Sequence, residues 1–232
     1  MADPRLIVAL DLPTRAEAEG LVETLGDSVG FYKIGLQVLA TGGMDMARDL
    51  KARGRQVFLD WKLHDIGATV EKATAAIVGS GACDLLTVHA HPQVLEAAVR
   101  GRGGDRNARI LGVTVLTSLN GQDLAAMGYG MGVEALVERR IRQVIDAGAD
   151  GVVASPHEAP IARRIGGPDF LVVTPGIRPA GAAMNDQARA ATPADALANG
   201  ASHLVVGRPI TAATDPRAAA LAVSREMDAV AA

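Results

Sequence analysis

The chain has 232 residues, of which 49% are hydrophobic and 3% aromatic, and its formal net charge is −3. This length and apolar content allow one large α/β domain with a sizeable core. The slightly negative charge, without a block of basic residues interleaved with aromatics, excludes a general nucleic-acid-binding surface. No apolar run approaches the roughly 20 residues of a membrane span. From these two observations, neither nucleic acid nor membrane is expected as a partner.

Cysteine usage and the N-terminal segment predict a cellular compartment. The single cysteine, Cys83, allows no internal disulfide and fits a reducing environment. The apolar run near the N-terminus is too short for a signal peptide, and an aspartate flanks it on each side. We therefore expect a cytoplasmic protein.

Eight short runs rich in β-branched residues predict strands, and Ala-rich segments of helical character separate them. The predicted strands span residues 6–12, 31–36, 56–63, 85–91, 109–118, 151–155, 170–176 and 203–209. Residues Thr14, Ser155, Thr192 and Asp215 are typical helix N-caps and predict where four of the helices begin.

The regular alternation of strand and helix predicts parallel pairing with right-handed crossovers. Eight such units in about 230 residues indicate a single-domain α/β fold over residues 1–232, a (β/α)8 TIM barrel. An open, doubly wound sheet is the alternative, because the pattern does not by itself prove that the sheet closes.

The predicted third strand contains charges of both signs within the stretch FLDWKLHD. Residues two apart share a face of a strand, so Asp60 and Lys62 lie opposite the apolar Leu59 and Trp61. The same parity turns Asp11 and Lys33 inward at the ends of the first two strands. Four charges are thus expected at the carboxyl ends of the strands, where barrel enzymes have their active sites. The alternative is a buried ion-pair network that serves only stability.

The loops after the last two strands carry signals for phosphate binding. Barrels commonly bind phosphate there, and here the loops span residues 174–187 and 205–210. Gly207 allows close approach to an anion, and Arg178 and Arg208 supply forked donors. A simple turn with a solvated arginine is the alternative explanation for each feature alone.

The H-x-H pair formed by His89 and His91 raises the question of a metal site. No further ligands cluster at the spacing that metals require, so no metal ion is expected and the histidines are interpreted as supporting residues.

The combined motifs resemble those of the orotidine 5′-phosphate decarboxylase family over the whole chain. The strongest is D-x-K-x-x-D at residues 60–65, followed by Ile66 and Thr69. Supporting segments are ALD at 9–11, YKIG at 32–35, VLTS at 115–118, VTPGIR at 173–178, NDQ at 185–187 and VVGR at 205–208. One departure is Gly67, where many relatives have proline, but this residue is not a catalytic group.

The resemblance implies decarboxylation of orotidine 5′-phosphate to UMP without a cofactor, in a homodimer. It assigns Lys62 as the proton donor to C6 of the pyrimidine and Asp60 to the substrate carboxylate. It makes Lys33 and Asp65 part of an alternating charge network, with Asp65 and Thr69 donated by the partner subunit. The remaining substrate-binding residues that it implies are Asp11 and Lys33 near the ribose, Ile66, Thr117 near the pyrimidine, Pro175, and Arg178, Gln187, Gly207 and Arg208 for the phosphate and its lid.

Two other functions stay open from the sequence. Magnesium-dependent sugar-phosphate decarboxylases or aldolases of the same superfamily share the D-x-K-x-x-D strand, but they place an acidic metal ligand where this chain has Lys33. A non-catalytic nucleotide-binding barrel would keep the phosphate loops but would lose the network of lysines and aspartates, and this chain retains both.

Overall fold

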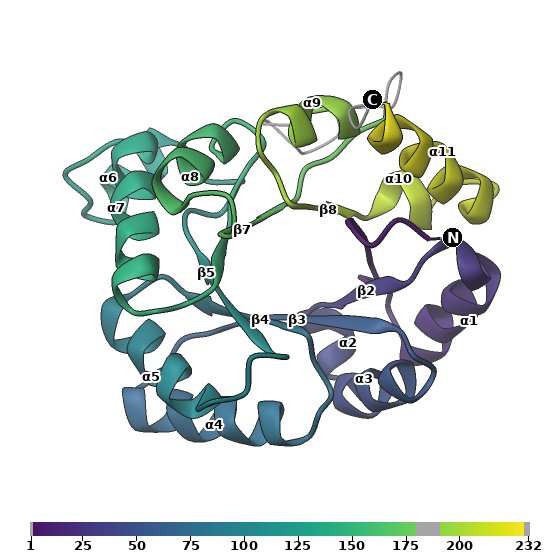
Figure 1. Ribbon diagram of the computed structural model, residues 1–232, viewed down its shortest axis with the longest axis horizontal. Coiled ribbons are helices and arrows are strands. Elements are labelled where there is room, and N and C mark those ends of the chain that lie inside the picture. Colours follow the sequence, from purple (N-terminus) through teal and green to yellow (C-terminus); the bar gives the residue numbers. More distant parts are fainter. Residues whose placement is uncertain (1, 180–190, 230–232) are drawn as a thin grey trace.

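The computed structural model describes residues 2–179 and 191–229. Within them, eight parallel strands close into a barrel in chain order, and β8 pairs with β1. The strands are β1 Leu6–Ala9, β2 Phe31–Ile34, β3 Gln56–Leu63, β4 Leu85–His89, β5 Arg109–Val113, β6 Gly151–Val153, β7 Leu171–Thr174 and β8 His203–Val206. Figure 1 looks into the ring of strands, with the helices around it. The predicted TIM barrel is confirmed, and the open sheet is wrong because the pairing of β8 with β1 closes the ring.

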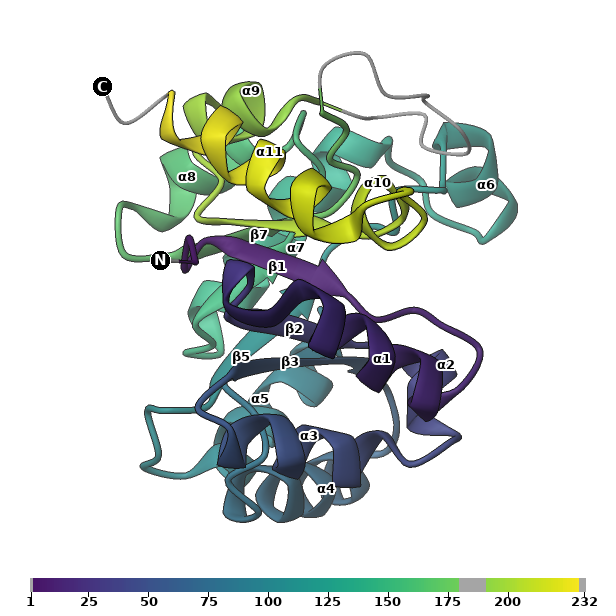
Figure 2. The same ribbon diagram turned by 90° about the vertical axis from the view of Figure 1, so that its right-hand side faces the viewer.

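In the described ranges, one main helix follows each strand and leads to the next. In order they are α1 Arg15–Leu25, α3 Gly43–Ala52, α4 Gly67–Gly79, α5 Pro92–Arg102, α7 Val133–Asp146, α8 Ala159–Gly166, α9 Pro193–Ala198 and α11 Pro216–Asp228. Additional short helices are α2 Leu36–Leu39, α6 Gly121–Ala126, α10 Arg208–Thr211 and the 3-10 turn Gly26–Ser28. Figure 2 shows α2 and α6 on the side toward which β1 points. In the described ranges, no helix combines the length and apolarity that crossing a membrane requires.

Three of the four predicted N-caps are confirmed. The side chains of Thr14, Thr192 and Asp215 each accept a hydrogen bond from the backbone N–H three residues later. The fourth prediction is wrong, because α8 begins only at Ala159 and Glu158 is its N-cap. The Glu158 carboxylate instead accepts from the backbone N–H of Ser155, which closes a turn ahead of the helix.

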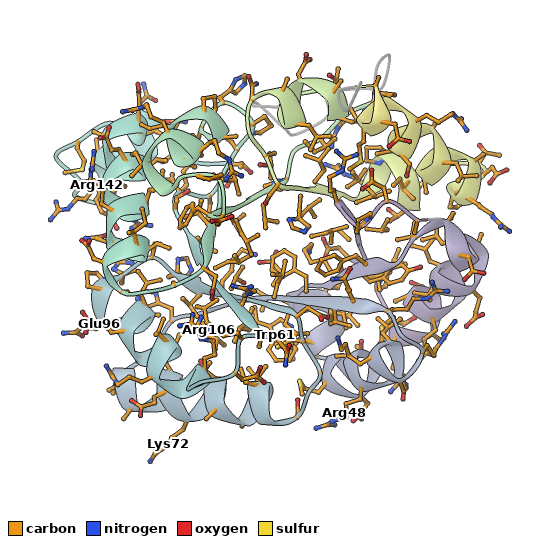
Figure 3. The ribbon with its side chains drawn as sticks, viewed as in Figure 1. Arg48, Trp61, Lys72, Glu96, Arg106 and Arg142 are labelled. Atoms are coloured by element: carbon orange, nitrogen blue, oxygen red, sulfur yellow. The ribbon has the colours of Figure 1, made fainter. Side chains whose placement is uncertain are left out.

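The core has two layers, and they follow the alternation of the strands. Inside the barrel lie Ile7, Ala9, Phe31, Phe58, Leu85, Leu111, Val173 and Val205. The alternate residues of the same strands, such as Leu59 and Trp61, pack in the larger layer beneath the helices. Figure 3 labels Trp61 on the helix side of β3. The predicted parity is therefore confirmed, and Asp60 and Lys62 lie on the inner side with Phe58.

A repeated polar contact closes the amino end of the barrel. Asp84, Asp150 and Ser202 each stand immediately before an even-numbered strand. Each accepts a hydrogen bond from a backbone N–H of the preceding odd-numbered strand, at 2.7, 2.8 and 2.9 Å. Lys51 pairs with Asp84, and Arg102 pairs with the nearly buried Asp150. These contacts lie at the amino end of the strands, which in such barrels serves stability. The charged residues lie at the opposite, carboxyl end.

Candidate active site

Four charged side chains form a continuous alternating chain at the carboxyl ends of β1, β2 and β3. Lys33 Nζ lies 2.9 and 3.0 Å from the two carboxylate oxygens of Asp11 and 3.6 Å from Asp60 Oδ2. Lys62 Nζ lies 2.9 Å from Asp60 Oδ1. The order is therefore Asp11, Lys33, Asp60, Lys62, with each lysine beside at least one carboxylate. The four residues that parity predicted at the mouth do meet.

Burial increases along this chain toward its centre. The side chains of Lys33 and Asp60 are 9% and 13% exposed, whereas that of Asp11 is about half exposed at 51%. Burial by itself raises the pKa of Asp60, but Lys33, Lys62 and the hydrogen bonds from Lys62 and Thr87 together hold that pKa below its usual value. Asp60 is thus an ionised carboxylate at neutral pH, held in a largely dry position.

Lys62 has an unusual backbone for a lysine. Its φ is +50°, and it is the one non-glycine residue with positive φ in the described part of the chain. The register between β3 and β4 shifts at the same place, between Leu59 and Leu63. Such bulges and left-handed residues re-aim side chains and are found preferentially at active sites. Lys62 lines the cavity from this bulge.

A cavity of about 450 Å³ opens at this end of the barrel. The four charges line one part of its wall, and Pro175, Arg178, Gly207 and Arg208 line the part formed by the loops after β7 and β8. Thr117, after β5, also lines it. Nine residues predicted at the site thus surround one cavity, which is large enough for a nucleotide-sized ligand.

The arginine part of the cavity is suited to an anion. Arg178 is nearly buried, and burial followed by the neighbouring Arg208 lowers its pKa below the ordinary value. Its guanidinium still carries its charge at neutral pH, because arginine does not deprotonate in proteins. Among the described residues, Arg178 Nε has no hydrogen-bond partner. A bound phosphate would offset the positive charges of Arg178 and Arg208 and supply hydrogen-bond acceptors for their guanidinium groups.

Three predicted residues lie outside this cavity of the protomer. Asp65, Ile66 and Thr69 are exposed, and Ile66 is 76% exposed. Asp65 Oδ1 accepts a hydrogen bond of 2.6 Å from the Ile66 backbone N–H, and no cation of the described residues forms an ion pair with this carboxylate. A fourth predicted residue, Gln187, lies outside the described residues.

The histidines border a different cavity. His64 stacks on His91 with ring centroids 4.7 Å apart, and His89 lies 5.0 Å from His64. They line a second space of about 250 Å³ together with Arg140. Burial, then the neighbouring His64 and His91, lower the pKa of His89 to about 4. In residues 2–179 and 191–229, no group of acidic, histidine or cysteine side chains has the arrangement of a metal site.

Sequence reasoning missed further residues at the site, and three of them bear on its polar contacts. Thr87 on β4 hydrogen-bonds Asp60 and the Lys62 backbone, Thr211 lines the cavity, and Gly35 leaves room for Asp11. Strand parity could have found Thr87, since it shares the inward face of β4 with Leu85. The role of Gly35 could not be found that way, because it depends on the position of a side chain from another strand.

A closed (β/α)8 barrel with a charged, nucleotide-sized cavity at the carboxyl ends of its strands defines the architecture of a barrel enzyme. Comparison with known proteins identifies the family. Residues 4–223 match the family model described as Orotidine 5′-phosphate decarboxylase / HUMPS family. The chain belongs to this family and is an enzyme.

Individual relatives extend the similarity over nearly the full length. The chain is 66% identical to the orotidine 5′-phosphate decarboxylase of Caulobacter sp. (strain K31), covering 97% of this chain and 98% of the relative. It is 56% identical to that of Methylobacterium radiotolerans, covering 98% of each. A solved structure of the enzyme from Lactobacillus acidophilus aligns with a TM-score of 0.85 at 36% identity, covering 97% of this chain and all of that one.

Proposed function

We propose that this chain decarboxylates orotidine 5′-phosphate to UMP in pyrimidine biosynthesis, without a cofactor and with Lys62 as the proton donor. The observation that carries the proposal is the alternating chain Asp11–Lys33–Asp60–Lys62 on one side of a cavity that has two arginines on the other. Such an arrangement fits a ligand with a reacting carboxylate at one end and a phosphate at the other. The names of the relatives support the same substrate.

In the proposed reaction the bond between C6 and the carboxylate carbon breaks, and CO2 leaves. Its electron pair remains in an in-plane orbital at C6, which the pyrimidine π-system does not delocalise. The Lys62 ammonium stabilises this charge and then transfers a proton to C6, which yields UMP and leaves a neutral amine that solvent reprotonates. Asp60, 2.9 Å away, holds the ammonium in place before the reaction.

The other groups act in binding. Asp11 and Lys33 are proposed to bind the ribose hydroxyls, and Thr117 and Pro175 to bound the pyrimidine. Arg178, Gln187, Gly207 and Arg208 are proposed to hold the phosphate. Gly207 precedes the short helix α10, which matches the place where barrels commonly bind phosphate. Binding energy from this remote group can organise the reacting end.

The residue at the end of β2 argues against the magnesium-dependent alternative. Its family pattern needs an acidic metal ligand there, whereas this chain has Lys33, which is paired with two carboxylates. A lysine held as an ammonium has no lone pair for a metal.

The test follows the absorbance of orotidine 5′-phosphate with metal-stripped protein, with and without EDTA. We expect UMP to form at the same rate in both, and Lys62→Ala to lose at least about 100-fold in kcat, as the loss of an acid catalyst predicts. UMP binding by Lys62→Ala should persist. Activity that EDTA abolishes and magnesium restores would overturn the proposal, as would absence of turnover by folded protein.

We also propose that two copies share their sites, each donating Asp65 and Thr69 to the other. Asp65 lies outside its own cavity, beside Ile66 with its large exposed apolar surface. The exposed Leu36, Leu116 and Met127 also follow the carboxyl ends of strands, so apolar surface gathers at the mouth. Patches of this kind mark interaction sites.

Mixed dimers test this sharing. Asp60→Ala and Asp65→Ala homodimers should each be nearly inactive, because every site lacks one carboxylate. A mixed dimer has one site with both lesions and one intact site. Random re-pairing of equal amounts therefore restores roughly a quarter of all sites, as two-fold symmetry requires. Subunit exchange verified by mass spectrometry without any return of activity would assign Asp65 to its own chain.

A further inference from the structure

The bulge in β3 places three residues opposite one. Leu59 pairs with Leu86 and Leu63 pairs with Val88, so Asp60, Trp61 and Lys62 all lie opposite the single residue Thr87. This is the place where the backbone of Lys62 turns to a φ of +50°. A left-handed conformation costs about 1–2 kcal/mol in a residue with a Cβ, so neighbouring contacts must hold it.

Thr87 makes the contacts that span the bulge. Its Oγ1 accepts a hydrogen bond of 3.0 Å from the Lys62 backbone N–H, and its hydroxyl donates one of 3.0 Å to Asp60 Oδ1. The same Asp60 oxygen lies 2.9 Å from Lys62 Nζ. One hydroxyl therefore connects the backbone of the lysine to the carboxylate that holds the ammonium of that lysine.

We propose that Thr87 is a positioning residue, whose hydroxyl sets the location of the Lys62 ammonium by fixing both the bulged backbone and the Asp60 carboxylate. The inference rests on the proposed roles of Asp60 and Lys62 and adds the group that aligns them. Thr87 itself does not line the cavity, so it acts through its two neighbours.

The chemistry of this position requires a hydroxyl. A hydroxyl both accepts and donates at a single atom, which valine and alanine side chains cannot do. Thr87 is fully buried, so bulk water does not compete with its two hydrogen bonds. The branched Cβ also restricts the side chain to few rotamers, which keeps the hydroxyl on its two partners.

Thr87→Val keeps the shape and removes the hydroxyl, whereas Thr87→Ser keeps the hydroxyl and removes the methyl. We expect kcat for orotidine 5′-phosphate to fall at least about tenfold in Thr87→Val, while Thr87→Ser stays within about threefold of wild type. KM and the Kd for UMP should change little in both, because the arginine end is untouched. If Thr87→Val does not fold, Thr87→Ala carries the same expectation.

A matched control separates positioning from general destabilisation. Thr114 is also fully buried, and its hydroxyl donates a 3.0 Å hydrogen bond to the carbonyl of Val153 and not to a member of the charge chain. Thr114→Val should lower the melting temperature about as much as Thr87→Val and leave kcat unchanged.

The pH profile supplies a second readout. Lys33 and Lys62 face Asp60 and remain in Thr87→Val, but one hydrogen bond that favours the ionised carboxylate is gone. The acid limb of kcat should therefore move to higher pH in Thr87→Val and stay in place in Thr87→Ser and Thr114→Val.

Three results would overturn the inference: wild-type kcat in folded Thr87→Val, equal losses in Thr87→Val and Thr87→Ser, or an acid limb that does not move. An inactive wild-type protein would instead refute the proposed function, so the two failures are distinct.

Discussion

Replacing Gly35 with alanine tests whether the position of Asp11 matters for turnover. A Cβ on Gly35 would lie 2.3 Å from Asp11 Oδ1 and 3.0 Å from Lys33 Nζ. The backbone angles of Gly35, φ −89° and ψ −175°, are open to alanine, so the variant introduces a clash and no backbone strain. The carboxylate oxygen must retreat by about 1 Å to reach an ordinary contact.

That displacement breaks the 2.9 and 3.0 Å contacts between Lys33 and Asp11. Asp11 is half exposed and can turn into solvent, so we expect stability to change by only about 0.5 kcal/mol. The displaced Asp11 carboxylate also loses its proposed hydrogen bond to the ribose. A hydrogen bond to a charged group contributes about 1.5–3 kcal/mol, here to the complex with substrate. The value of kcat/KM should thus fall about 10- to 100-fold.

The assay is steady-state decarboxylation with a melting curve for each variant. Gly20→Ala is the control, because nothing lies within 4 Å of a Cβ at this exposed position of α1. It should keep full activity and gain about 0.5–1 kcal/mol of stability. A double-mutant cycle adds Asp11→Ala: if Gly35→Ala acts through Asp11, the double variant is no worse than Asp11→Ala alone. Full activity in Gly35→Ala, or additive losses in the cycle, would refute the reasoning.

Two further predictions concern other parts of the site. Arg208→Ala should lower kcat/KM for orotidine 5′-phosphate by at least about 100-fold but affect a substrate analogue without phosphate much less; equal losses on both would show that Arg208 acts through folding. The pKa of His89 in the folded protein is about 4, below the ordinary 6.5. Between these two pH values the unfolded chain binds more protons than the folded one, so the free energy of unfolding falls as pH drops from 6.5 toward 4. Urea unfolding at pH 7.5 and 5.0 should show His89→Gln losing about 1 kcal/mol less than wild type, a figure discounted because His89 is only partly buried. An equal loss in the two proteins would contradict this origin.

Much of the barrel could be predicted because each strand and helix is encoded locally. All eight strands begin within one residue of their predicted start, since β-branched runs and turn residues mark them. Several predicted strands extended too far, as with residues 109–118, because apolar residues at the mouth continue past the last ladder pair of Val113. Parity placed Asp60 and Lys62 correctly because a strand fixes which side alternate residues face.

The finer features of the site depend on contacts between strands, which one sequence does not display. The bulge at Lys62 arises from the pairing of β3 with β4, and no residue in FLDWKL marks it. The hydroxyl of Thr87 gains its importance only when β4 lies beside Asp60. Likewise, Ser155 looked like an N-cap, but the carboxylate of Glu158 takes its backbone N–H and delays the helix.

The polar contacts at the amino end of the barrel have a consequence for the evolution of the sequence. Asp84, Asp150 and Ser202 fasten pairs of strands, and none of them belongs to the charge chain or lines its cavity. Effects of substitutions at separate sites without shared partners add nearly independently. Adaptation to a hotter or colder habitat can therefore proceed at one end of the barrel while the substrate preference at the other end is inherited unchanged.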